Sequence, residues 1–345
     1  AAAEAAGSFA PVELDMTTGA RGSRHAHVAR QVCSLTGAEG AVVVNNNAAA
    51  LMLVLSTVAP GQGVAVARGE LIEIGGSFRL PEIIESGGAR LREVGTTNRT
   101  RVEDFERALR DAVAILRIHT SNYRVEGFCE MPSIRDLATV ARRWDVPLIH
   151  DTGSGLLSDE VRFEIPEDEP SAASSLRDGA DLVLFSGDKI LGGPQCGIIA
   201  GRRAWIDRIA SHPMMRAMRL DKIRLAALDR TLAIWRDPSR ARAEIPLLRM
   251  LGISIDDLTR RAERLSPSMG ADVVATEAFI GGGSVPGRGV ASVGLAIRTS
   301  HPDALMDRLR RASPPVVARV HDGAVVFDLR TVEARDDDHL VHAVQ

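Results

Sequence analysis

One lysine stands inside a glycine-rich turn between two apolar segments of this sequence. The first apolar run, 182–185, is typical of a buried strand, and Lys189 follows it just before a Gly-Gly pair. A second apolar run, 198–200, continues the chain. A lysine amine held at a strand end is suited to Schiff-base chemistry with a carbonyl cofactor. An exposed loop lysine between two strands would explain this segment equally well.

Two further predicted strand ends carry groups that would complete such a site. Asn45, Asn46 and Asn47 lie between a short apolar strand and an apolar helix, where amides and free N–H groups could bind a phosphate. Helix capping by one asparagine is the alternative. Asp151 follows another strand and could keep a pyridinium nitrogen protonated, or could cap a loop. Lysine, phosphate site and aspartate together indicate pyridoxal 5′-phosphate, although none does so alone.

Other polar residues near predicted strand ends are weaker candidates. Asp188, which precedes Lys189, could act as an acid or base or could cap the turn. Tyr123 is the only tyrosine and could stack or donate a proton, but an ordinary loop tyrosine is equally plausible. Thr96 and Thr97 could bind anionic substrate groups, and turn formation is the alternative that composition favours.

A pair of arginines could receive an anion. Arg216 and Arg219 are three residues apart and would share a helix face if their segment is helical. They could then clamp an oxyanion, although a solvated basic face is the commoner explanation of such spacing. His150, beside Asp151, could lie in the site, whereas the remaining histidines are scattered.

Composition limits the class of protein. The 345 residues are 45% hydrophobic and 25% charged, with a net charge of −3, so no global basic excess indicates nucleic-acid binding. No metal is expected, because the cysteines have neither zinc nor redox spacing, and their number fits a reducing compartment. We find no signal-peptide pattern and no apolar run of membrane-spanning length. The sequence therefore predicts a cytoplasmic protein without a membrane partner.

Strands and helices alternate through most of the chain. This pattern predicts an α/β fold with a mainly parallel sheet and helices on both faces. The polar clusters follow strands, and open α/β sheets bind ligands outside the carboxyl ends of their strands. We expect an unstructured N-terminal lead-in over 1–20, a cofactor-binding large domain over 21–240 and a small α+β domain over 241–345. Within the small domain, a hairpin should turn at Asp322 and Gly323.

These motifs, in this order, resemble the bacterial selenocysteine synthase family, the L-seryl-tRNA(Sec) selenium transferases. The resemblance extends from about Arg21 to Leu329. The strings that carry it are 44–50, 68–79, 93–100, 119–123, 151–155 and 185–195. It does not extend to the N-terminal tRNA-binding domain of the family, which we expect to be missing from this stretch of sequence. It implies a fold-type-I pyridoxal phosphate transferase, with a large domain like that of aspartate aminotransferase.

The resemblance also implies roles for individual residues. Lys189 would carry the pyridoxal 5′-phosphate and Asp151 would meet its ring nitrogen. The residues expected near the phosphate are Asn46, Asn47 and Ser186. A catalytic setting would be formed by Asp188, Thr96, Thr97 and Tyr123. The selenium donor would be received by Arg216 and Arg219.

The implied reaction converts seryl-tRNA(Sec) to selenocysteinyl-tRNA(Sec) through an aminoacrylyl intermediate, with selenophosphate as the selenium donor. The implied assembly is a symmetric homo-oligomer built from dimers, decameric if it follows the bacterial family. One alternative is a pyridoxal phosphate lyase that acts on a small amino acid or amino sugar without tRNA. Another is a catalytically idle assembly subunit, against which the intact Lys189 and Asp151 argue.

Overall fold

A seven-stranded sheet forms the centre of the larger of two units into which contacts divide the chain. The computed structural model describes residues 1–345, apart from the side chain of Ile74. The first unit comprises Ala1–Ile245 together with Gly281–Pro286, and the second comprises Pro246–Ile280 and Gly287–Gln345. In sequence, Gly281–Pro286 lies inside the range 241–345 assigned above to the small domain.

The sheet of the first unit has the strand order β1-β9-β8-β7-β6-β2-β5. Its strands are β1 (Gly40–Val44), β2 (Gly63–Ala67), β5 (Arg90–Val94), β6 (Ala112–Ile118), β7 (Leu148–Gly153), β8 (Leu182–Ser186) and β9 (Gly197–Gly201). Only β9 is antiparallel to its neighbours, so β1 and β8 run in the same direction. The predicted α/β class with a mainly parallel sheet is confirmed. A separate two-stranded hairpin consists of β3 (Glu73–Ile74) and β4 (Phe78–Arg79).

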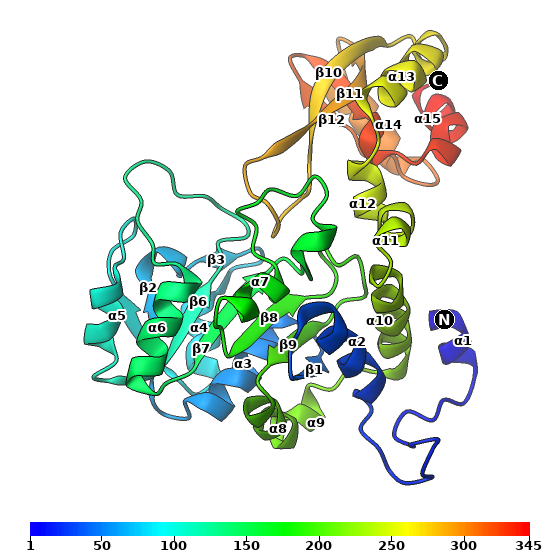
Figure 1. Ribbon diagram of the computed structural model, residues 1–345. Helices are drawn as coiled ribbons and strands as arrows, with labels where there is room; N and C mark the ends of the chain where they lie inside the picture. Colours follow the sequence, from blue (N-terminus) through cyan, green and yellow to red (C-terminus); the bar gives the residue numbers. More distant parts are fainter. The chain divides into compact units, whose positions relative to one another are not determined.

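Helices cover both faces of this sheet, as Figure 1 shows. The first-unit helices are α1 (Ala2–Gly7), α2 (Ala26–Thr36), α3 (Asn47–Val58), α4 (Leu80–Ser86), α5 (Val102–Ala108), α6 (Ile134–Trp144), α7 (Ala172–Arg177), α8 (Arg203–Ser211), α9 (Met214–Ala217), α10 (Lys222–Trp235) and α11 (Pro238–Glu244). Helix α2 ends at Gly37, whose φ of 77° only glycine adopts cheaply. Helix α6 is capped by Ser133, which forms a reciprocal capping box with Asp136. Helix α1 lies in the stretch expected to be unstructured, so that expectation was wrong for these six residues.

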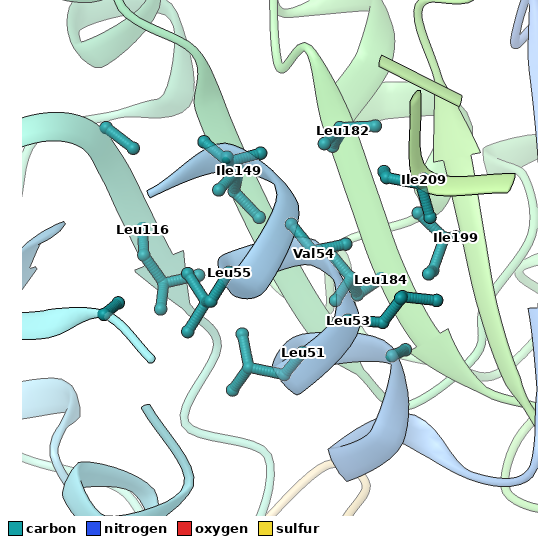
Figure 2. Close-up of a cluster of buried hydrophobic side chains, with 14 of the residues drawn as sticks. Leu51, Leu53, Val54, Leu55, Leu116, Ile149, Leu182, Leu184, Ile199 and Ile209 are labelled. Carbon is teal, nitrogen blue, oxygen red and sulfur yellow. The ribbon is translucent and has the colours of Figure 1, made fainter. Parts of the chain in front are cut away.

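Helix α3 places the asparagine cluster because it is anchored in the main core. Its sequence is apolar on almost every side, which is typical of a helix buried between layers. Figure 2 shows its side chains gathered with those of the strands and of α8: Leu51, Leu53, Val54 and Leu55 with Leu116, Ile149, Leu182, Leu184, Ile199 and Ile209. Full burial of each leucine contributes about 2 kcal/mol, so the N-terminus of α3 is held rigidly at the sheet edge.

The second unit is a four-stranded antiparallel sheet with helices. Its strands are β10 (Asp272–Phe279), β11 (Gly289–Arg298), β12 (Arg319–His321) and β13 (Ala324–Asp328), in the order β10-β11-β13-β12. Its helices are α12 (Pro246–Leu251), α13 (Ile255–Met269), α14 (Pro302–Arg311) and α15 (Asp337–Val344). The predicted hairpin turn is confirmed, since Asp322 and Gly323 both have positive φ between β12 and β13. None of the helices in the described part of the chain has the length and apolar character needed to span a bilayer.

Candidate active site

The carboxyl ends of four strands meet along one edge of the large sheet. Val44 at the end of β1 pairs with Gly197 of β9, and Gly197 pairs with Ser186 at the end of β8. In β7, Asp151 pairs with Ile118 of β6 on one side and with Leu184 of β8 on the other. The segments that follow these strands therefore begin close together, and they carry the asparagine cluster, the lysine turn and the aspartate.

Asp151 is the buried acid of this edge, with 5% of its surface exposed. Its Oδ1 accepts hydrogen bonds from Nδ2 of Asn47 at 2.8 Å and from the backbone N–H of Gly153 at 3.0 Å. Burial raises the pKa of Asp151 to about 6, although the Asn47 hydrogen bond and the charge of Lys189 oppose the shift. Among the described residues no donor reaches Oδ2, so this oxygen remains able to accept a hydrogen bond from a cationic ring N–H.

Lys189 lies in a turn that backbone hydrogen bonds hold in place. The carbonyl of Lys189 accepts from the N–H of Gly192 at 2.9 Å, and the next residue, Ile190, donates to the carbonyl of Ser154 at 2.9 Å. The amine Nζ lies beside two glycines, Gly153 and Gly283. A Cβ atom on them would stand 3.9 Å and 2.7 Å, respectively, from Nζ. The lysine amine and the Asp151 carboxylate thus share Gly153 as a neighbour.

The three asparagines have separate contacts. Asn46 is the N-cap of α3, and its Oδ1 accepts from the N–H of Ala49 at 2.8 Å. Asn47 is bonded to Asp151, as described above, and the amide of Asn45 faces the carbonyls of Met218 and Arg219. The capping alternative therefore holds for the Asn46 side chain. The first N–H groups of α3 remain without intrahelical partners, which suits an anion.

Thr96, Thr97 and Tyr123 lie on loops that follow β5 and β6. Thr96 closes a turn through its hydroxyl, which donates to the carbonyl of Arg99 at 2.9 Å, in line with the turn-forming alternative. The Tyr123 hydroxyl donates to the carbonyl of Gly69, and burial raises the pKa of Tyr123. Beside these loops is a cavity of about 240 Å³ whose lining includes Thr97, Asn98, Arg117, His119 and Arg124.

His119 connects this cavity to the aspartate. Its backbone N–H donates to the carbonyl of Asp151 at 2.8 Å, and its charge when protonated would lower the pKa of Asp151. Nε2 of His119 lies 3.2 Å from Oε2 of Glu169, whose side chain is 3% exposed. We did not identify either residue as a site residue from the sequence. The position of His119 directly after a strand was the signal that could have indicated it.

His150 does not lie in the site. Its Nδ1 is within hydrogen-bond distance of Oγ of Ser175 in α7, at 2.9 Å, and burial lowers its pKa well below the ordinary value. Neighbouring residues of a strand point to opposite faces, so His150 faces α7 while Asp151 does not.

Two arginines and one acid were predicted near the lysine. Arg216 lies in α9, which ends at Ala217, so the segment is not helical as far as Arg219 and the condition for a shared helix face is not met. Both side chains are exposed, and Nη1 of Arg219 lies 3.5 Å from Oε1 of Glu13. Asp188 is exposed beside Lys189. The backbone of Arg219 nevertheless forms an isolated β-bridge with Val44, which brings it to the end of β1.

Comparisons with known proteins agree on one family. The sequence model described as L-seryl-tRNA selenium transferase matches residues 1–333. The L-seryl-tRNA(Sec) selenium transferase of Solidesulfovibrio magneticus is 46% identical over 357 residues, which cover 100% of this chain and 76% of that relative. The protein of that name from Hyphomonas neptunium is 45% identical over 353 residues, covering 99% and 76%. The chain thus spans about three quarters of the length of these relatives.

Solved structures show the same fold. A D-glucosaminate-6-phosphate ammonia-lyase superposes with a TM-score of 0.70 at 22% identity, covering 99% of this chain and 88% of that chain. The serine palmitoyltransferase of Sphingomonas wittichii gives a TM-score of 0.51 at 12% identity, covering 99% and 81%. At these identities the likeness shows the fold alone, and that fold is the fold-type-I fold of pyridoxal phosphate enzymes, as predicted.

Proposed function

The chain belongs to the L-seryl-tRNA selenium transferase family, and from this membership we propose that it converts seryl-tRNA(Sec) to selenocysteinyl-tRNA(Sec). The observation that carries the proposal is the family match over residues 1–333, because it includes every strand end that builds the site. The cofactor is pyridoxal 5′-phosphate, and the selenium donor is selenophosphate.

The residues at the sheet edge fit this cofactor. Asp151 is buried, its pKa is raised by burial, and a protonated ring nitrogen would supply the hydrogen-bond donor that Oδ2 lacks among the described residues. Lys189 approaches the same space from the next strand, and Gly153 leaves room between them. The N-terminus of α3 with Asn46 and Asn47, and the end of β8 at Ser186, would hold the phosphate.

Bound pyridoxal phosphate supplies an electron-withdrawing ring that stabilises negative charge on the α-carbon of the seryl group. Asp151 would keep a proton on the ring nitrogen. The amine of Lys189 would hold the cofactor covalently and, when free, could move the α-proton of the substrate. Asp188 is exposed, so it can exchange protons with solvent and act as the acid for the leaving β-hydroxyl.

The cavity beside His119 would receive the seryl ester end of the substrate. Thr97 contributes to its lining, Thr96 shapes the turn that carries Thr97, and Tyr123 lies on the loop that follows β6. The raised pKa of Tyr123 keeps its hydroxyl protonated at neutral pH, and because that proton is donated to the carbonyl of Gly69, the hydroxyl oxygen can accept a hydrogen bond from the substrate.

Arg216 and Arg219 are the proposed receptors of the oxyanionic selenium donor. Both are exposed, and the backbone of Arg219 lies against the end of β1, near the asparagine cluster. Guanidinium groups bind phosphate oxygens bidentately, which suits selenophosphate. We further propose a cytoplasmic location and a homo-oligomer built from dimers, decameric if it follows the family.

The decisive experiment supplies the chain with pyridoxal phosphate, seryl-tRNA(Sec) and selenophosphate, and measures selenocysteinyl-tRNA(Sec) by mass spectrometry. We expect product from the unmodified chain and none from Lys189→Ala. Release of ammonia from a small hydroxy amino acid or amino sugar, without any selenocysteinyl product, would instead favour the lyase alternative.

A further inference from the structure

The cavity beside His119 has a buried charged pair among its lining residues. Glu70, in the short turn Arg68–Glu70 that follows β2, is 0% exposed. Its Oε2 accepts a hydrogen bond from the backbone N–H of Ile118 at 3.0 Å, and its Oε1 forms an ion pair with Nη1 of Arg117. Glu70, Arg117 and Ile118 all line the cavity. Burial lowers the pKa of Arg117 to about 10, so its guanidinium is charged at neutral pH and Glu70 supplies its counter-charge.

The other charged side chains of this lining are paired as well. The distances from nitrogen to oxygen are 3.2 Å for His119 with Glu169, 3.6 Å and 3.9 Å for Arg124 with Glu126 and with Asp168, and 3.5 Å for Arg101 with Glu130. His119 adds a positive charge only when it is protonated, and Glu169 then balances that charge. Each charged group of the cavity thus has a partner of opposite charge.

This arrangement suits an uncharged group better than an anion. A carboxylate that leaves water needs a cation to pair with, and each cation of the lining already has an anionic partner. An ester carbonyl carries no charge and needs only a hydrogen-bond donor. The hydroxyl groups of Thr97 and Thr120, in the same lining, are donors of this kind.

We propose that this cavity selects the ester of an amino acid over the free amino acid, and that Glu70 determines the choice by neutralising Arg117. The proposal rests on the proposed function, because it takes this cavity as the place of the seryl ester. It adds the substrate class, which is an amino acid whose carboxyl group is esterified. A free amino acid would bring a carboxylate to a cavity in which the guanidinium of Arg117 is already paired.

The first test compares L-serine with L-serine methyl ester on the full chain loaded with pyridoxal phosphate. Each compound is titrated while the visible absorbance of the bound cofactor is recorded. Each Kd is expressed for the free-amine form, because the two amines differ in pKa. We expect the ester to bind at least about tenfold more tightly. L-serine that binds as tightly as its methyl ester would overturn the proposal. Neither compound contains tRNA, so this result does not depend on whether the chain makes selenocysteinyl-tRNA(Sec).

The second test removes the counter-charge of Arg117. Glu70→Gln keeps an oxygen that can accept from the N–H of Ile118, but it leaves the guanidinium of Arg117 without an anion. L-serine should bind about tenfold more tightly to this variant than to the unmodified chain, whereas the Kd of the methyl ester should change less than about threefold. Arg117→Gln, added to Glu70→Gln, removes the exposed charge and should restore the original preference for the ester.

Glu93→Gln is the matched control for this variant. It also breaks an ion pair between a glutamate and an arginine, that of Glu93 with Arg68 at 2.7 Å, but Glu93 is exposed and lies outside the cavity lining. Both Kd values should stay as they are in the unmodified chain. A folded Glu70→Gln chain with the Kd ratio of the control would overturn the role of Glu70. If Glu70→Gln does not fold, the first test, which needs no variant, decides the proposal.

Discussion

The side-chain amide of Asn47 donates a 2.8 Å hydrogen bond to Oδ1 of Asp151 across 104 residues of sequence. The bond joins the first turn of α3 to the end of β7, and it engages only Oδ1 of Asp151. The residue expected to contact a phosphate therefore also orients the residue expected to meet the ring nitrogen.

This bond predicts different effects for two adjacent asparagines. Asn47→Ala removes a donor that opposes the raised pKa of Asp151, so that pKa should rise further and pyridoxal phosphate should bind about tenfold more weakly. Asn46→Ala removes the N-cap of α3 and should cost about 1 kcal/mol of unfolding free energy. A pH titration of the visible absorbance of the bound cofactor separates the two. Identical titrations for both variants would contradict the distinction.

The strand ends could be predicted from sequence because apolar runs and polar turns are local signals. The run before Asp151 and the run before Lys189 both form strands, and parallel pairing brings their ends together. Asn46 shows the limit of this reasoning. One asparagine in a cluster of three was enough for a cap, but the sequence does not tell which one caps and which one reaches Asp151.

The contacts of Glu169 and Gly283 could not be predicted in this way. Glu169 lies in a polar segment with no periodicity, and its partner His119 is 50 residues away. Gly283 lies 94 residues after Lys189, in a glycine-rich turn that sequence alone explains as an ordinary connection between strands. Both contacts depend on tertiary packing, which leaves no pattern in the chain. The break between α9 and Arg219 was missed for a similar reason, since exposed basic residues have little periodicity to interpret.

The arginine pair gives a kinetic prediction. Arg216→Ala and Arg219→Ala should each raise the KM for selenophosphate about tenfold, because a charged hydrogen bond to the donor is lost. The KM for seryl-tRNA(Sec) should stay within about twofold. Arg236→Ala is the control, an exposed arginine just after α10. Equal KM increases for both substrates would show that these arginines do not discriminate the donor.

The three cysteines should differ in reactivity, which provides a check on the lysine turn. Cys129 is exposed, whereas burial raises the pKa of the half-buried Cys33. Burial and the negative charge of Asp188 raise the pKa of Cys196 to about 12. We expect Ellman's reagent to titrate Cys129 first, and Cys129→Ser to abolish that fast phase. Cys196 should react only after unfolding, so its rapid modification in the folded chain would contradict the packing of Cys196 against Gly187.

Asp151 gives the clearest pH prediction. Burial raises its pKa from 3.8 to about 6, so between these values the folded chain binds more protons than the unfolded chain. The stability of the cofactor-free chain should therefore fall as the pH rises from about 4 to about 6, and a penalty of up to about 3 kcal/mol should be fully present above that window. Asp151→Asn keeps the oxygen that accepts from Asn47 and removes the buried charge. Its cofactor-free form should thus have a higher Tm than the unmodified chain at about pH 8 and a similar Tm at about pH 4.

The same variant should lose affinity for the cofactor, because a neutral amide cannot neutralise a protonated ring nitrogen. We expect pyridoxal phosphate to bind at least about tenfold more weakly to Asp151→Asn at about pH 8, measured by visible absorbance. If Asp151→Asn makes the cofactor-free chain more stable but weakens cofactor binding, then Asp151 serves to bind the cofactor ring and does not stabilise the fold. A variant that is destabilised without cofactor at high pH and binds it normally would show instead that Asp151 serves mainly to stabilise the loop that follows β7.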